Sequence, residues 1–368
     1  MLMLPGPETR GERTATNTLA PGAATRRISL PGPVAAARQT EPPRERDAPR
    51  PDSRGSAPHS PGDADRRVRV HSALAALAKG VSDPDHADLE ELVEALREAL
   101  AGASADEMSA VLDTFRETTD PGLLDSLASA LKPHGLARPE VLAALGALAE
   151  RDTSEVRRAA AITALGLAPP DDALVGYLDR LARTDPAAEV RAAAVKALGS
   201  SLESDPARGA AILERLLEVV LHDDDGGVRA AAIWSLRGRD ADATAVGQLV
   251  RVLGTDRDLG PRQAAAETLA DVGPEHRLAA LAALEGALAE ERDQDLRRTI
   301  LTSIIRAGGA AAIPVLESVK ARHADLARDA DDYLVELRRG VTDMEQLSEL
   351  KQRKDAARST SAVAAQNE

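Results

Sequence analysis

The chain has 368 residues and a formal net charge of −14; 29% of its residues are charged and only 1% are aromatic. It contains no cysteine, which excludes disulfide frameworks and every form of thiolate chemistry. Alanine and leucine supply most of the apolar residues, a composition that favours an all-helical protein.

Residues 1–65 form a segment rich in proline and arginine. We expect it to be disordered, because it cannot bury enough apolar surface to offset the entropy of ordering. Before Asp63 it has nine arginines and six acidic residues, a balance of about +3, so the rest of the chain has about −17, since −14 − 3 = −17. Within it, Arg26-Arg27-Ile28-Ser29 is similar to a basophilic kinase site, where phosphate would change the local charge.

The first residues do not have the pattern of a secretory signal. Met1 to Leu4 are apolar, but Pro5 follows at once and no basic residue precedes them. No run approaches about 18 apolar residues, so no membrane span is expected, and the cytoplasm is the predicted compartment. The many prolines disfavour the amphipathic helix of a transit peptide. A misassigned start codon, which would leave a secretory signal out of the sequence, is an alternative.

From Arg66 to Gly340 apolar residues recur with a helical period, which predicts about eight helix pairs. The first pair, at about 70–80 and 89–96, lacks the repeat described below and is expected to cap the array. Residues 341–358 predict a final helix that covers the other end of the core or, alternatively, docks a partner. Residues 359–368 are expected to be a frayed, disordered tail.

Between about residues 141 and 273 a frame of three residues recurs: an Asp, an Arg six positions later and a Leu seven positions after the Arg. The arginines are 33 to 38 residues apart, a period typical of stacked helix pairs. Towards the ends the frame degrades, as terminal repeats do: Asp becomes Glu291, and the Arg is lost at Leu124 and Ala327. The complete frames are Asp152/Arg158/Leu165, Asp185/Arg191/Leu198, Asp223/Arg229/Leu236 and Asp256/Arg262/Leu269.

Each frame predicts a turn followed by a helix. Val190, Ala194 and Leu198 are spaced at i, i+4 and i+8, so they form one apolar side. The frame Asp can accept backbone amides at the helix N-terminus, and Gly166 and Gly199 lie where a helix would end. A second apolar segment, about ten residues before each Asp, supplies the other helix of the pair.

These residues resemble the HEAT-repeat family, in particular its short bacterial form, whose signature appears here as Asp185…Val190-Arg191 through Gly199. The resemblance implies an all-α solenoid whose second helices, near Val190, Val228 and Pro261, line a concave face. It also implies a ladder in which frame Asp and Arg residues pair within or between repeats. The expected ladder residues are Asp152, Arg158, Asp185, Arg191, Asp223, Arg229, Asp256, Arg262 and Arg297.

The residue five positions after each frame Arg varies and is mostly polar. In a helix whose 190/194/198 side is buried, this position projects about 140° away, so we expect it to be exposed on the lining. Trp234, the one tryptophan, occurs at this position near the middle of the array; it is an interface anchor or, alternatively, fills a gap between helices. The row is Ser129, Thr163, Lys196, Trp234, Glu267, Thr302 and Asp332, and the predicted partner-binding residues are Trp234, Lys196, Glu267, Thr163 and Thr302.

The sequence predicts no catalytic, metal or cofactor site. Its seven histidines have no i, i+4 spacing, and the His-Glu pairs of the HEAT-like iron hydroxylases do not occur. The acidic turn at 222–227 lacks the spacing of a calcium loop, and no phosphate loop or nucleophile elbow is present. Nucleic acid is not an expected ligand, because the array is acidic and each frame Arg has an acidic residue in its frame.

We therefore expect a non-enzymatic scaffold that holds a protein or peptide partner on its concave face. The alternative is an enzyme-associated role, because the resemblance extends to phycobilin lyase-type HEAT proteins. An acidic tetrapyrrole would need a basic or aromatic pocket, however, and the sequence offers little of either. A structural array for envelope or cytoskeletal assembly is a third possibility.

Overall fold

A computed structural model describes residues 61–83, 88–202, 206–238, 243–347, 349–350 and 352–354. In these residues the chain forms sixteen α-helices and one short 3-10 helix, with no β-strand. The predicted arm as far as residue 60, the kinase-like site within it and the tail at 359–368 lie outside the described residues. The all-α fold expected from the sequence is confirmed.

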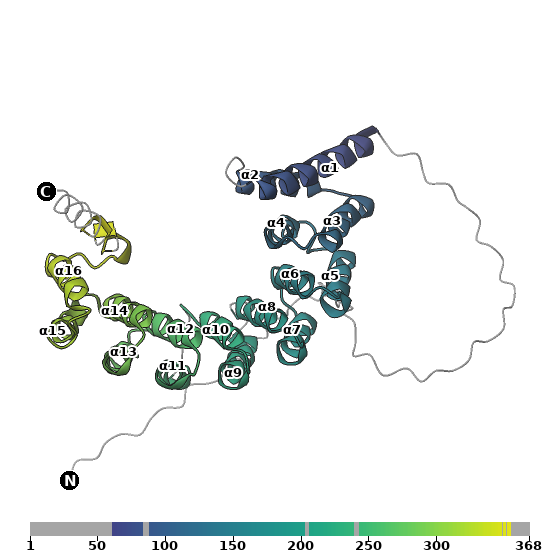
Figure 1. Cartoon of the computed structure of the whole chain (residues 1–368). Helices are drawn as coiled ribbons and strands as arrows, with labels where there is room; N and C mark the ends of the chain where they lie inside the picture. The colour runs from purple at the N-terminus through teal and green to yellow at the C-terminus, as the bar shows by residue number, and fades with distance from the viewer. Residues whose placement is uncertain are drawn as a thin grey trace, which may run out of the picture.

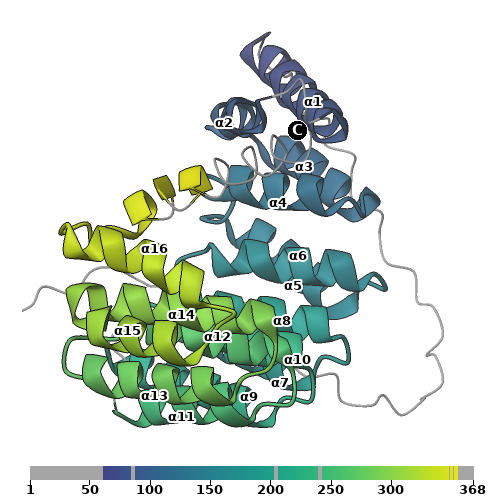
Figure 2. The same ribbon diagram turned by 60° about the vertical axis from the view of Figure 1, so that its left-hand side comes forward.

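The helices form a curved array of antiparallel pairs, with one helix of each pair on the inside of the curve and one on the outside (Figure 1). The two ends of the array are α1 and α2 on one side and α15 and α16 on the other (Figure 1). In the turned view, the neighbouring inner helices α4 and α6 lie one below the other with their axes roughly aligned (Figure 2). The outer helices are α1 (Pro61–Ser82), α3 (Ala105–Glu117), α5 (Pro139–Arg151), α7 (Asp172–Thr184), α9 (Pro206–His222), α11 (Ala243–Thr255), α13 (Arg277–Glu290) and α15 (Ile313–Arg322). The inner helices are α2 (Leu89–Leu100), α4 (Pro121–Leu131), α6 (Glu155–Gly166), α8 (Ala188–Ser200), α10 (Gly226–Trp234), α12 (Leu259–Leu269), α14 (Gln294–Gly308) and α16 (Ala327–Arg338).

Small residues allow the inner helices to pack directly on one another. A Cβ atom on Gly166 would lie 2.6 Å from Cβ of Ala197, and one on Gly199 would lie 2.6 Å from Cβ of Ser235. The prediction that these glycines stop their helices is right in position, but its reason is wrong. Neither has a positive φ, so they are needed for close approach of the next helix rather than for a left-handed cap.

The array begins five residues earlier than the sequence predicts. Helix α1 starts at Pro61, not at Arg66. Proline is favoured in the first turn, because its fixed φ suits a helix and its missing N–H has no intrahelical partner there. Apolar residues recur with a helical period only from Val70 onward, so this pattern could not predict that the polar residues before it belong to the helix.

Residues beyond α16 lie against the C-terminal end of the core, in the part that the structure describes. Residues 344–347 are helical, and Leu347 is 1% exposed against the core. Lys354 lies 3.0 Å from Glu336 and 3.6 Å from Asp332, both buried on α16. Asp332 was expected in the exposed row; that expectation is wrong, because Asp332 is only 7% exposed and Lys354 lies against it.

One described stretch, Gln294–Arg322, is long and apolar enough to span a membrane by length and composition, and 44% of its most apolar window is buried in the array. It consists of α14, the 3-10 helix η1 (Gly309–Ala312) and α15. The chain bends at Gly309, which has φ 51°, so that α14 is an inner helix and α15 an outer one. Packing against the neighbouring repeats therefore accounts for its apolar residues.

Candidate functional site

The frame residues form a ladder of ion pairs that joins each repeat to the next. In the first four rungs the Arg at the start of one inner helix reaches the frame carboxylate of the following repeat; in the last rung Arg297 reaches Asp325, because the frame position there is Ala321. Arg191 Nη2, for example, lies 2.9 Å from Asp223 Oδ1. The ladder therefore runs between repeats, one of the two arrangements implied by the resemblance. Its rungs among the described residues are Arg158–Asp185, Arg191–Asp223, Arg229–Asp256, Arg262–Glu291 and Arg297–Asp325.

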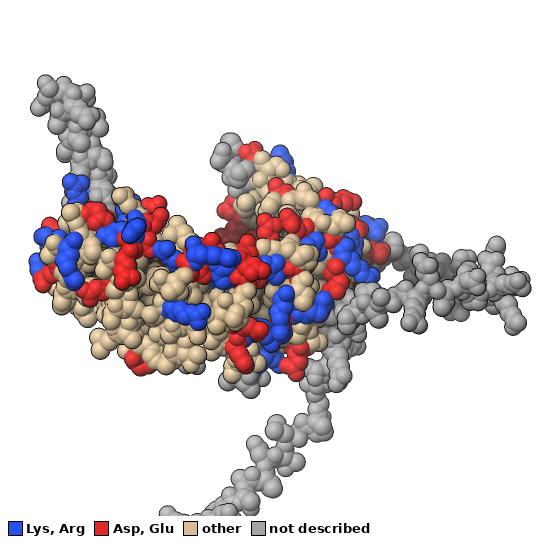
Figure 3. Space-filling view, turned by 60° about the horizontal axis from the view of Figure 1, so that its bottom comes forward, with Lys and Arg blue, Asp and Glu red and all other residues tan. Residues whose placement is uncertain are grey.

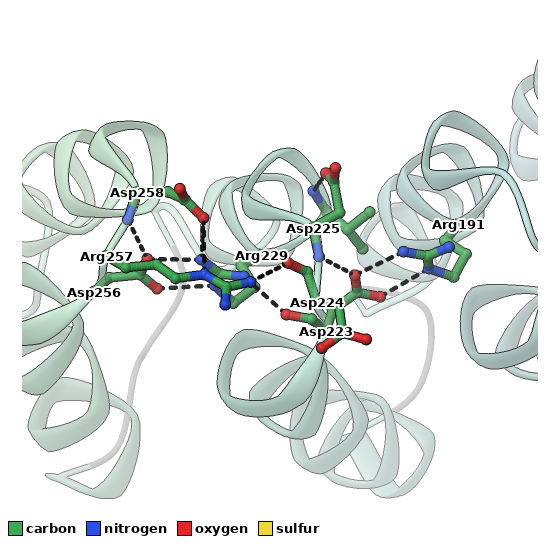
Figure 4. A network of polar contacts seen from close by, with 9 residues as sticks. Arg191, Asp223, Asp224, Asp225, Arg229, Asp256, Arg257 and Asp258 are labelled. Atoms are coloured by element: carbon green, nitrogen blue, oxygen red, sulfur yellow. Dashed lines mark hydrogen bonds and ion pairs between the residues drawn. The ribbon is translucent and has the colours of Figure 1, made fainter.

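Arg229 shows how one guanidinium joins two repeats (Figure 4). Its Nε and Nη2 donate to the two carboxylate oxygens of Asp256, over 2.9 and 2.7 Å, and Nη2 also donates to Asp258 over 2.7 Å. Its Nη1 donates over 2.8 Å to the backbone carbonyl of Asp223 in its own repeat. The Arg229 side chain is only 6% exposed and that of Asp256 only 9%, so their contact is shielded from water, whereas the Asp258 side chain is 46% exposed.

The frame carboxylate also accepts a backbone amide in the turn before the inner helix. It was predicted to cap the helix itself, but the capping residue lies two positions further along the chain. Asp223 Oδ1 accepts the backbone N–H of Asp225 over 2.9 Å, and Asp225 is the residue that caps α10. Burial raises the pKa of Asp223, but the hydrogen bonds from Arg191 and from this amide outweigh it, so the pKa lies below its ordinary value. The opposing carboxylate raises the pKa of Arg191, so both partners remain charged.

The lining residues are exposed unevenly. Thr163 and Lys196 are exposed, and Trp234 is 36% exposed. Glu267 and Thr302 are half-buried: Glu267 accepts a hydrogen bond from Gln263, and the Thr302 hydroxyl donates to a backbone carbonyl. The concave lining thus displays the predicted residues on α6, α8 and α10 more fully than those on α12 and α14.

A charged cluster surrounds Trp234 on this lining. The Arg237 guanidinium lies 5.2 Å from the centre of the Trp234 ring, a cation–π arrangement. Arg237 also lies 2.6 Å from Asp271 and 3.7 Å from Glu267, and Arg306 lies 3.0 Å from the other side of Asp271. We call these five residues, Trp234, Arg237, Glu267, Asp271 and Arg306, the tryptophan cluster.

A second feature of the lining is an apolar hollow at the N-terminal half of the array. One part of about 320 Å³ lies between α4 and α6, with Val156, Ala159 and Ala160 on its floor and Thr163 at its side. A second part of about 420 Å³ continues across α8 to the start of α10. We call the whole the concave trough; its carboxylates are Asp125, Glu155, Glu189 and Asp225.

The outer surface differs from this lining. With the underside of Figure 1 brought forward, acidic and basic side chains alternate in a band along the array, beside a broad area that has few charges (Figure 3). Helix α11 contributes a single charged residue, Arg251, to the outer row. On α7, Tyr177 is buried and donates its hydroxyl to the carbonyl of Gly146 over 3.0 Å, so it packs between outer helices.

Comparison with known proteins agrees with this geometry. Residues 142–237 and 213–305 match the family described as HEAT repeats, and these ranges contain all four complete frames and the Glu291 frame. The chain belongs to the HEAT-repeat family. The finer resemblance to the phycobilin lyase type is not confirmed.

A solved structure of the Escherichia coli protein YibA is similar over 65% of this chain and 95% of that one, at 17% identity and a TM-score of 0.34. Among the curated proteins, none matches the sequence.

Sequence reasoning found Trp234 and Glu267 but missed the rest of the tryptophan cluster. Arg237, Asp271 and Arg306 lie eight or nine positions after their frame arginines and alternate in charge from repeat to repeat. That alternation of charge was the pattern from which the cluster could have been predicted. The trough had a weaker signal: the residue one position after the frame Arg is alanine in three successive repeats, as Ala159, Ala192 and Ala230. Only the curvature shows that these positions form one surface.

Proposed function

We propose that this protein is a non-enzymatic scaffold whose concave face holds a partner protein or peptide, with Trp234 as the anchor of the contact. The observation that supports this most is the state of Trp234 itself. A large aromatic side chain is partly exposed on an inner helix at the centre of the array, where burial would be expected for a residue of its size. Exposed central tryptophans are frequent binding hot spots.

The surroundings of Trp234 support the same role. Arg237 lies over the ring and is itself held by Asp271, which Arg306 contacts from the next repeat. A ring fixed in this way loses little conformational entropy when a partner packs on it, so more of the contact energy appears as affinity. Lys196 and Glu267 lie at equivalent positions in the neighbouring repeats and would select the charge of the partner.

The alternative role in chromophore attachment has less support. The lining of the trough has four carboxylates, Asp125, Glu155, Glu189 and Asp225, and no basic or aromatic side chain. An acidic tetrapyrrole placed there would meet like charges, which oppose binding. A polypeptide partner with basic side chains has no such cost.

Capture of partners from the source organism tests the proposal. The full chain, immobilised, is compared with Trp234→Ala and with the control Leu278→Ala; Leu278 is 78% exposed on the outer helix α13. We expect Trp234→Ala to lose specific proteins at least about tenfold by quantitative mass spectrometry, a loss of about 1.4 kcal/mol. Leu278→Ala should retain them. Identical partner sets for all three proteins would contradict the proposal.

A further inference from the structure

The concave trough has charges that the described residues do not neutralise. Asp125, Glu155 and Glu189 are exposed on α4, α6 and α8, and none of them forms an ion pair with another described residue. By contrast, Glu267 and Asp271, further along the same lining, each lie near an arginine. The trough is therefore an apolar floor with a rim of unpaired negative charge.

This combination defines the chemistry of a ligand that fits it. Ala159, Ala160 and Ala192 are small and Val156 is half-buried, so the floor can take aliphatic or proline side chains but offers no polar partner. The rim calls for arginines or lysines. Acidic residues in the ligand would be repelled. The fitting ligand is an extended peptide that is both apolar and basic and lacks Asp and Glu.

The chain itself contains such a segment. Residues 13–40 have four arginines and no acidic residue. Within them, residues 26–38 have the sequence Arg-Arg-Ile-Ser-Leu-Pro-Gly-Pro-Val-Ala-Ala-Ala-Arg, with basic residues at both ends of an apolar, proline-containing run. The neighbouring residues 41–54 also have four arginines, but they have four acidic residues as well, so their charges cancel.

The connection is long enough. The trough begins on α4, where a Cβ atom on Gly122 would lie 3.4 Å from the Val81 side chain near the C-terminal end of α1. Helix α1 has 22 residues and is therefore about 33 Å long, so its first residue, Pro61, lies about that far from this end. The roughly 22 residues between 38 and 61 can span about 75 Å when extended, more than the distance required.

We propose that the concave trough binds residues 26–38 of the same chain, with their arginines against Asp125, Glu155 and Glu189 and their apolar residues on the alanine floor. The arm then occupies part of the concave face that receives a partner in the proposed function, on which this inference rests, so a partner that extends from Trp234 into the trough must compete with it. A phosphate on Ser29 would bring about two negative charges to the acidic rim and release the segment.

Because the chain has no cysteine, a disulfide between two introduced cysteines tests this directly in the full protein. The test variant is Ser29→Cys with Thr163→Cys in the trough. The control is Ser29→Cys with Thr184→Cys on outer helix α7. Both threonines are exposed, and each donates its hydroxyl to the carbonyl four residues earlier, so the two replacements are matched. Disulfide formation under mild oxidation is followed on non-reducing gels.

We expect the Thr163 pair to form an intramolecular disulfide at least about fivefold faster than the Thr184 pair, because binding raises the local concentration of the thiol introduced at position 29 near the trough. Replacing Asp125, Glu155 and Glu189 by Asn, Gln and Gln should remove the difference, and so should Arg26→Ser with Arg27→Ser. Equal rates for the two pairs would refute the proposal. A disulfide-linked dimer would also refute it, by showing that the arm of a second copy fills the trough. No partner is present in this test, so its failure leaves the proposed scaffold function to be judged by the Trp234 experiment.

Discussion

The inner helices have charged residues in two places: the ladder at their first turns and the lining along their exposed sides. The ladder charges serve stability, and the lining charges serve binding. In the ladder each Arg has its carboxylate from the next repeat, and rungs such as Arg229–Asp256 are almost fully buried. In the trough, carboxylates such as Glu189 have no described partner. Charges paired within the chain hold repeats together, whereas charges left unpaired are available to a ligand.

If this contrast is correct, substitutions in the ladder reduce stability, and substitutions in the lining reduce binding. The following predictions test it in order of expected size.

The largest effect should come from Arg229→Ala. It leaves Asp256 buried without its partner and removes four hydrogen bonds, so we expect a loss of about 3 kcal/mol in the free energy of unfolding. Urea denaturation followed by circular dichroism measures it. Arg251→Ala is the control, since Arg251 is exposed on α11 and makes no ion pair with a described residue; it should change stability by less than about 0.5 kcal/mol. Similar losses for both arginines would show that a ladder arginine contributes no more to stability than an exposed arginine outside the ladder.

Gly199→Ala should be next in size. In an open helix this change stabilises by about 1 kcal/mol, but here the new Cβ would lie 2.6 Å from Ser235 Cβ, so we expect a net loss of about 1–3 kcal/mol. The matched change Gly286→Ala on outer helix α13 meets nothing within 4 Å and should stabilise by about 0.5–1 kcal/mol. Thermal melts of the two variants give the sign directly. A gain for Gly199→Ala would mean that the inner helices are not closely packed at this point.

Acidification should weaken the ladder gradually. The pKa values of Asp223 and Asp256 are below the ordinary value of 3.8, because the Arg191 and Arg229 hydrogen bonds outweigh the effect of burial. Groups with a lowered folded-state pKa stabilise the fold above their unfolded pKa and lose that contribution as pH falls through the folded value. We therefore expect the melting temperature to fall below about pH 4. In Asp223→Asn the fall should be shallower, and a curve parallel to that of the wild type would exclude Asp223 as a contributor.

The smallest change in stability should come from the lining. Replacing Asp125, Glu155 and Glu189 by their amides removes no described ion pair, and surface charges of this kind contribute less than about 1 kcal/mol. We expect a melting temperature within a few degrees of the wild-type value, together with loss of the rapid disulfide between the cysteines introduced at positions 29 and 163. A large fall in melting temperature would show that these carboxylates are structural.

Much of this protein was determined by its sequence alone. The Asp–Arg–Leu frame predicted the helix pairs, because cap, apolar side and turn all depend on neighbours close in the chain. The inner and outer rows and the ladder were implied by the resemblance to HEAT repeats. Asp223 and Arg229, six residues apart, could be assigned to one turn without knowledge of the fold.

The tertiary structure decided which residues meet across repeats. It paired Arg229 with Asp256 rather than with the side chain of Asp223, used Gly166 and Gly199 for close approach, and buried Asp332 under Lys354. It also placed Asp125, Glu155 and Glu189 around one trough. These outcomes depend on the spacing and curvature of stacked helices, which arise from packing between residues some 22 to 36 positions apart, so local sequence periodicity does not encode them.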